Sequence, residues 1–126
     1  MIRELLAVGG GGALGSICRY ALSYGLLAGQ TICGFPAGTF TVNAVGSLLI
    51  GLLLEVLDSQ TAAWLLVVGF CGGFTTFSSF SADTVRLLRA ECYGPALLYV
   101  ASSVAVCIAF AALGWWIGTL LKNLTD

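Results

Sequence analysis

Apolar residues dominate four long stretches of the chain, and charged residues lie almost entirely between them. The stretches run from about residue 4 to 28, 38 to 56, 61 to 85 and 95 to 121. As helices, they are long enough to cross a bilayer hydrocarbon core of about 30 Å. The connecting segments are too short to fold separately. The pattern predicts an all-α integral membrane protein, a single domain (1–126) of four transmembrane helices.

The third stretch contains a segment that is unsuited to a regular helix. The sequence GFCGGFTTFSSFS, residues 69–81, crowds glycine and β-branched threonine together, and both weaken helices. A broken helix frees backbone groups, which a membrane tolerates only against protein or a watery cavity. Transport proteins use such helix ends to bind ions. We predict that the third helix unwinds mid-membrane over residues 72–76, with a packing kink as the alternative.

Polar side chains form a stripe on the second and on the fourth predicted helix. The stripes, each at i,i+4 spacing, consist of Thr39, Asn43, Ser47 and Gly51, and of Tyr99, Ser103 and Cys107. An asparagine within a span is costly against lipid, so Asn43 is expected to face protein or a water-filled path. Alternatives remain open: a helix–helix hydrogen bond from Asn43, an interfacial anchor at Tyr99, and a bond from Ser103 back to its own helix.

The composition supports a membrane protein without enzymatic chemistry. Hydrophobic residues make up 59% of the chain and charged residues 9%, far less charge than a soluble domain carries. There is no histidine, the commonest general base, and no P-loop motif for a nucleotide. The five cysteines show no CxxC spacing and are interpreted as small apolar residues. We expect neither an enzyme nor a nucleic-acid partner.

Lysine and arginine are divided evenly between the two predicted sides of the membrane. Four spans place both termini, with Arg3 and Lys122, on one side, while Arg86 and Arg89 lie on the other and Arg19 stands alone. Positive residues normally mark the cytoplasmic side, so an equal tally predicts insertion in both orientations. Pairing of opposite copies then predicts an antiparallel, dual-topology homodimer.

Glycines at GxxxG spacing also favour close packing of helices, either between two copies or within one chain. The pairs are Gly11 with Gly15, Gly25 with Gly29, and Gly114 with Gly118. Glycines at 9–12 also interrupt the first apolar run, and Arg3 is followed at once by Glu4. We therefore expect the N-terminal segment to belong to the mature protein rather than to a signal peptide.

Three motifs resemble the small bacterial fluoride channel family known as Fluc or CrcB. They are GGALGSICRY (11–20), GTFTVNAVGSLLIG (38–51) and GFCGGFTTFSSF (69–80). Their order and spacing extend the resemblance over essentially the whole chain. Asp83 departs from the glutamate that many members carry, so we do not treat Asp83 as an essential group.

The resemblance implies a passive, fluoride-selective channel that spans the cell (inner or plasma) membrane several times and confers fluoride resistance. It implies an antiparallel homodimer with two fluoride pores. It also implies a structural sodium ion on the two-fold axis, held by the backbone carbonyls of Gly72 and Thr75 from each subunit.

The resemblance also assigns pore positions to the polar stripes and to the end of the broken helix. By similarity, Asn43 is the donor in the second span, Phe77 and Phe80 are paired rings, and Arg19 lies near a vestibule. The remaining expected pore positions are Thr39, Ser81, Tyr99 and Ser103. Ring edges carry positive potential, so the phenylalanines can present C–H groups to fluoride.

Two other functions compete with a channel. A small dual-topology drug/proton antiporter has a similar size but relies on a carboxylate deep in its first span, whereas Glu4 lies at the entrance of this one. A non-transporting membrane scaffold has no need of an in-membrane asparagine, a broken helix and paired rings together.

Overall fold

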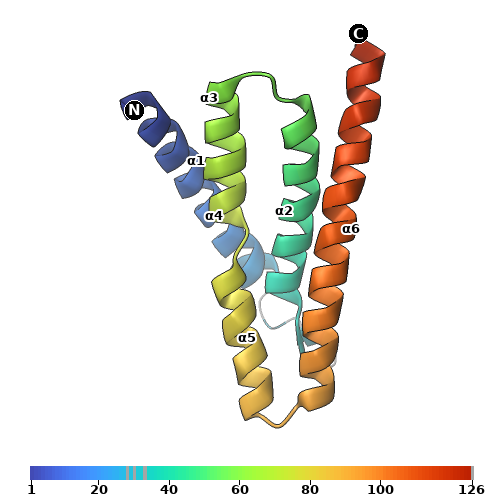
Figure 1. Ribbon diagram of the computed structural model, residues 1–126. Helices are drawn as coiled ribbons and strands as arrows, with labels where there is room; N and C mark the ends of the chain where they lie inside the picture. Colours follow the sequence, from blue (N-terminus) through green and yellow to red (C-terminus); the bar gives the residue numbers. More distant parts are fainter. Residues whose placement is uncertain (28, 30, 33, 126) are drawn as a thin grey trace.

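The computed structural model describes residues 1–27, 29, 31, 32 and 34–125 and consists mainly of four antiparallel helical spans (Figure 1). The long helices are α1 (Ile2–Tyr20), which continues as the π-helical η1 (Ala21–Leu26), α2 (Ala37–Val56) and α6 (Tyr93–Thr125). The third span is built from α3 (Gln60–Ala63), η2 (Trp64–Cys71), α4 (Gly72–Phe74) and α5 (Phe77–Arg89). All four are long and apolar enough to cross a membrane, which confirms the predicted architecture.

The described helices extend a few residues beyond most of the predicted stretches. The first runs to Leu26, and its predicted end at residue 28 lies outside the described residues. Between the first two spans, β1 (Thr31–Ile32) pairs antiparallel with β2 (Phe35–Pro36). Gly34 adopts φ +80°, a conformation that favours glycine in this tight turn. Two-residue strands have no detectable sequence period, so the pattern of apolar residues did not predict them.

Both chain termini lie at one end of the bundle, and the turn between α5 and α6 lies at the other (Figure 1). The cations near the termini are therefore separated from Arg86 and Arg89, which end α5. This arrangement agrees with the even division of positive charge between the two predicted sides.

Helix α2 runs alongside α6, and glycines allow their backbones to approach closely (Figure 1). A Cβ atom added to Gly51 would collide with the backbone carbonyl of Ala111, and one added to Gly114 would collide with that of Leu48. At Gly118, an added Cβ would lie 2.8 Å from a side-chain atom of α2. The glycines of α6 thus hold two helices of the same chain together.

The first span packs in the same way against the upper half of the third span, η2 and α4. Cβ atoms added to Gly11 or Gly15 would collide with carbonyl oxygens of η2, and one added to Gly73 would collide with that of Gly12. In contrast, Gly25 and Gly29 have no neighbouring atom within 4 Å of such a Cβ. The GxxxG pairs that make contacts serve packing within the chain, so they do not support a dimer, and the homodimer stays a prediction.

The third span is interrupted, as predicted, but the interruption is shorter than residues 72–76. Gly72 is still α-helical (φ −63°, ψ −38°), and Thr75 N–H still donates to the Cys71 carbonyl at 2.9 Å. Only Thr75 (φ −80°, ψ 156°) and Thr76 (φ −151°, ψ 113°) are extended. The prediction of unwinding at the glycines was wrong because Gly73 is needed for close contact with α1 rather than for conformational freedom.

Candidate functional site

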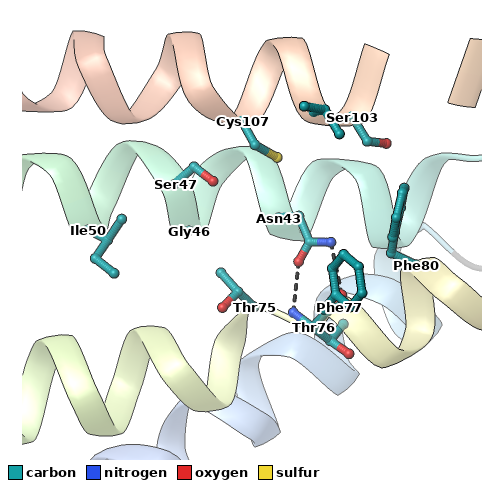
Figure 2. A pocket seen from close by; sticks show the side chains of 11 residues that line it. Asn43, Gly46, Ser47, Ile50, Thr75, Thr76, Phe77, Phe80, Ser103 and Cys107 are labelled. Atoms are coloured by element: carbon teal, nitrogen blue, oxygen red, sulfur yellow. Dashed lines mark hydrogen bonds between the residues drawn. The ribbon is translucent and has the colours of Figure 1, made fainter. Parts of the chain in front are cut away.

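A cavity of about 310 Å³ lies beside the interruption of the third span (Figure 2). Its walls come from α2, the extended pair Thr75–Thr76, the start of α5, and α6. The lining residues are Asn43, Gly46, Ser47, Ile50, Thr75, Thr76, Phe77, Phe80, Ser103, Val104 and Cys107. Both predicted polar stripes therefore contribute side chains to one space next to the predicted break.

Asn43 binds the extended backbone with both ends of its side-chain amide (Figure 2). Its Oδ1 accepts a hydrogen bond from Thr76 N–H at 2.8 Å, and its Nδ2 donates to the Thr76 carbonyl at 3.0 Å. These two bonds satisfy both backbone groups of a residue that is only 9% exposed. One N–H of the amide remains for other partners, because the NH₂ group carries two donors.

Thr76 also starts the next helix. Its Oγ1 accepts a hydrogen bond from Ser79 N–H at 3.1 Å, which makes Thr76 the N-cap of α5. The same hydroxyl lies 3.1 Å from the Ser78 hydroxyl and 3.2 Å from that of Ser79. Thr76 is not among the predicted site residues, although a threonine directly before FSSF is a recognisable N-cap signal.

The extended pair Thr75–Thr76 leaves the carbonyls just before α5 without their usual helical donors, and for two of them the donor is bound by a side chain. A continuous helix would pair Thr76 N–H with the Gly72 carbonyl and Ser79 N–H with the Thr75 carbonyl. Both N–H groups are instead bound by side chains, Asn43 Oδ1 and Thr76 Oγ1. The two carbonyls released in this way are the ones that the sequence resemblance selected for sodium.

Aromatic rings form a continuous series from the cavity into the protein. The ring centroids of Phe77 and Phe80 are 5.3 Å apart, and those of Phe80 and Tyr99 are also 5.3 Å apart. Phe35 contacts Tyr99 edge to face at 5.0 Å. Phe77, which lines the cavity, is 78% exposed, whereas Tyr99 is completely buried and packs against Phe80. Phe77 and Phe80 both line the cavity and can offer ring edges to a ligand within it.

Asp83 accepts hydrogen bonds at the end of this aromatic series. Thr39 Oγ1 donates to its Oδ2 at 2.8 Å, and the Tyr99 hydroxyl lies at 3.5 Å from the same oxygen. The other oxygen forms an ion pair with Arg86 at 2.9 Å. The carboxylate thus accepts hydrogen bonds from the hydroxyls of two predicted pore residues, Thr39 and Tyr99. Asp83 is not among the predicted site residues, although its position three residues after Phe80 places it on the same helix face.

The other predicted pore hydroxyls differ in their surroundings. Ser81 donates to the Phe77 carbonyl at 2.9 Å and lines neither of the two cavities described here. Ser103 is 6% exposed, and its Oγ has no hydrogen-bond partner among the described residues. An unpaired hydroxyl that is buried beside a cavity has a donor and lone pairs to offer to a ligand.

A second cavity, of about 240 Å³, shares Thr76 with the first as a lining residue. Its walls are formed by Ser16, Arg19, Tyr20, Ser23, Tyr24, Thr39, Thr76 and Ser79. Arg19 Nε is buried and finds no hydrogen-bond partner in the described part of the chain. Thr76 lines both cavities, so a polar space containing the predicted vestibule arginine adjoins the cavity of Asn43.

The structure therefore divides the predicted site residues into groups. Asn43, Thr75, Phe77, Phe80 and Ser103 line the larger cavity. The smaller cavity contains Arg19 and Thr39. Tyr99 packs behind Phe80, and Gly72 and Ser81 line neither space. The described residues contain no group of three or more His, Cys, Asp or Glu side chains arranged to hold a metal ion.

Comparisons with known proteins agree with this architecture over nearly the whole chain. The family model described as CrcB-like protein, Camphor Resistance (CrcB), matches residues 6–115. The chain is 47% identical over 124 residues to the fluoride-specific ion channel FluC of Thermus thermophilus, covering 95% of this chain and 98% of that protein. It is 44% identical to FluC of Caulobacter vibrioides (89% and 94% covered) and 48% identical to FluC of Coxiella burnetii (85% and 90% covered). The chain belongs to the CrcB family.

Proposed function

We propose that the protein is a fluoride-selective passive ion channel. The observation that carries this proposal is the similarity over almost the full length to proteins named fluoride-specific ion channels, together with the gathering of the polar and aromatic site residues around one cavity. As in those relatives, the protein is a multi-pass membrane protein. Its activity is transport rather than catalysis.

The larger cavity supplies the kinds of contact that a dehydrated fluoride ion needs. Fluoride is small and strongly hydrated, so a dry path must replace its water with other donors. The unpaired hydroxyl of Ser103 and the remaining N–H of Asn43 are two such donors. Ring edges of Phe77 and Phe80 add weak, positive C–H contacts. Weak contacts favour conduction, because an ion must leave each site as well as enter it.

The hydroxyls that are bonded to Asp83 have a different role in this proposal. Thr39 and Tyr99 donate toward the carboxylate, so their hydroxyl hydrogens are not free for an anion. To bind fluoride, either hydroxyl must first rotate away from Asp83. The pairing of Asp83 with Arg86 offsets the negative charge that would otherwise repel the anion.

The break in the third span fits a sodium ion. Unwound backbone carbonyls coordinate sodium in other membrane transport proteins. Here Gly72 and Thr75 each present a carbonyl whose usual helical donor is bonded elsewhere. In a two-fold dimer, the two subunits together would provide four such oxygens. A bound sodium ion would supply positive charge that lowers the cost of dehydrating a nearby anion.

The channel is proposed to act as an antiparallel homodimer of oppositely inserted copies, with two fluoride pores. Support comes from the equal numbers of lysine and arginine at the two ends of the bundle. Phe77 lines the larger cavity yet is 78% exposed, so a second copy could cover this ring. A C-terminal reporter that is active in one compartment only tests this. Activity confined to a single compartment contradicts dual topology.

Passive conduction is sufficient to remove fluoride from a cytoplasm. An interior-negative membrane potential drives an anion outward with about 2.3 kcal/mol per 100 mV. Fluoride that enters as the neutral acid and dissociates inside therefore leaves through an open, selective path without ATP. This gives fluoride resistance at the inner or plasma membrane.

Efflux from liposomes tests the proposal directly. Purified protein is reconstituted, and release of fluoride is compared with release of chloride. We expect fluoride efflux that far exceeds chloride efflux, and its loss in Phe80→Ile and Asn43→Asp. Equal chloride efflux, or no efflux of either ion, refutes a fluoride channel and leaves the antiporter or scaffold to be considered.

A further inference from the structure

Asn43 connects the larger cavity to the interruption of the third span. The side chain lines the cavity, and its amide is bonded on both sides to the backbone of Thr76 (Figure 2). The Thr76 N–H donates to Oδ1 at 2.8 Å, and Nδ2 donates to the Thr76 carbonyl at 3.0 Å. A side chain that served only as a donor to an anion would not need to accept a hydrogen bond from Thr76 N–H.

The bond from Thr76 N–H to Asn43 determines whether the Gly72 carbonyl has a helical hydrogen-bond donor. The last helical bond before the break is of the α-helical type, since Thr75 N–H donates to the Cys71 carbonyl at 2.9 Å. The next bond in the series would join Thr76 N–H to the Gly72 carbonyl. Asn43 Oδ1 occupies that N–H, so the helix cannot add the bond and the carbonyl stays available.

We infer that Asn43 is a positioning residue for the cation site: by binding Thr76 N–H, it keeps the Gly72 carbonyl free to coordinate sodium. This inference rests on the sodium site of the proposed function. Asn43 would then contribute to both the sodium site and the anion cavity, because its remaining N–H is available to an anion. Loss of the Asn43 acceptor oxygen therefore lowers sodium affinity, although Asn43 is not itself a sodium ligand.

A second interaction limits what the loss of Asn43 would do. Thr76 Oγ1 caps α5 by accepting the Ser79 N–H, and this bond does not involve Asn43. Removal of the amide therefore releases Thr76 N–H toward Gly72 but leaves the start of α5 capped. We expect the Gly72 carbonyl to be taken up by a new helical bond, while the Thr75 carbonyl remains free.

Two substitutions of Asn43 separate this role from anion binding. Asn43→Ala removes the acceptor for Thr76 N–H, and we expect sodium affinity to fall roughly tenfold as the new helical bond competes with the ion. Asn43→Asp retains an acceptor oxygen, so sodium affinity should stay within about threefold of the unaltered channel although fluoride efflux is lost. A merely structural role of Asn43 would affect both variants alike.

The measurement is sodium binding by the purified full-length channel in detergent, with radioactive sodium and with sodium-dependent thermal unfolding as a second readout. Ser47→Ala, one turn further along α2 and lining the same cavity, is the matched control and should leave sodium affinity unchanged. If Asn43→Ala binds sodium as tightly as the unaltered channel, the inference is overturned.

The Asn43→Asp variant keeps the inference falsifiable if Asn43→Ala does not fold. A tenfold loss of sodium affinity in a folded Asn43→Asp channel overturns it, since the acceptor is still present. Failure of the unaltered channel to bind sodium overturns both the inference and the sodium site. Fluoride-selective efflux in that case still supports the channel, so the failures are distinguishable.

Discussion

Replacing Thr76 with valine tests whether its hydroxyl holds the break in place. Valine matches threonine in shape but lacks the hydroxyl, so the change removes polar interactions with little change in packing volume. The hydroxyl is the N-cap of α5 and accepts Ser79 N–H at 3.1 Å. Because Thr76 is only 9% exposed, water does not readily replace the lost bond.

The expected cost follows from these contacts. Loss of a threonine N-cap destabilises a helix by about 1 kcal/mol, within a range of roughly 0.5–2 kcal/mol. Further loss comes from the neighbouring hydroxyls of Ser78 and Ser79, at 3.1 and 3.2 Å from Thr76 Oγ1. The bond that Thr76 itself donates, to Ser79 Oγ, adds about 1 kcal/mol. We expect Thr76→Val to lower the free energy of unfolding by about 2 kcal/mol in total.

Reversible unfolding of the purified channel in mixed detergent micelles measures this difference. Thr76→Ser, which retains the hydroxyl, is the control and should lose less than half as much stability. We also expect slower fluoride efflux from Thr76→Val, because Phe77 directly follows the cap and its ring position depends on the first turn of α5. Equal stability of the valine and serine variants would refute the assigned cap.

Two further substitutions test packing and the end of the bundle. Gly15→Ala places a Cβ against a backbone carbonyl of η2 and should cost about 1–3 kcal/mol in unfolding free energy, whereas Gly10→Ala, with no atom within 4 Å, should not destabilise the protein. Trp115→Phe removes the 2.7 Å hydrogen bond from the indole to Glu55 and should cost about 1 kcal/mol without changing fluoride efflux. Trp116→Phe, with the same 61% exposure, is the control for Trp115→Phe. All four variants are compared by thermal unfolding. Equal stability of the two glycine variants, or of the two tryptophan variants, would contradict the assigned contact.

The four spans were predictable because membrane crossing depends on local apolar length. A stretch of about 20 apolar residues satisfies its own backbone as a helix and needs no particular partner to enter a bilayer. The polar stripes were predictable for a similar reason, since i,i+4 spacing places side chains on one face whatever that face contacts. In the structure, both faces contribute side chains to the larger cavity.

The extent of the break was not predictable from its own residues. Glycine weakens a helix on average, yet Gly73 is helical because α1 packs against it closely. The extended pair Thr75–Thr76 depends instead on Asn43, which is 33 positions away from Thr76 in the sequence. Asp83 was missed for a related reason: its acceptor role becomes visible only when Thr39, 44 positions away, lies beside it.

The sequence by itself determined the membrane class, the number of spans, the segment that contains the break and, by resemblance, the family. These depend on hydrophobic length, helical period and local motifs, all of which are features of residues close together in the sequence. Only the tertiary structure decided which backbone groups lose their helical partners and which hydroxyls stay unpaired. Those outcomes depend on side chains from distant segments competing for the same donors, and a buried N–H bonds to whichever acceptor the fold brings within reach.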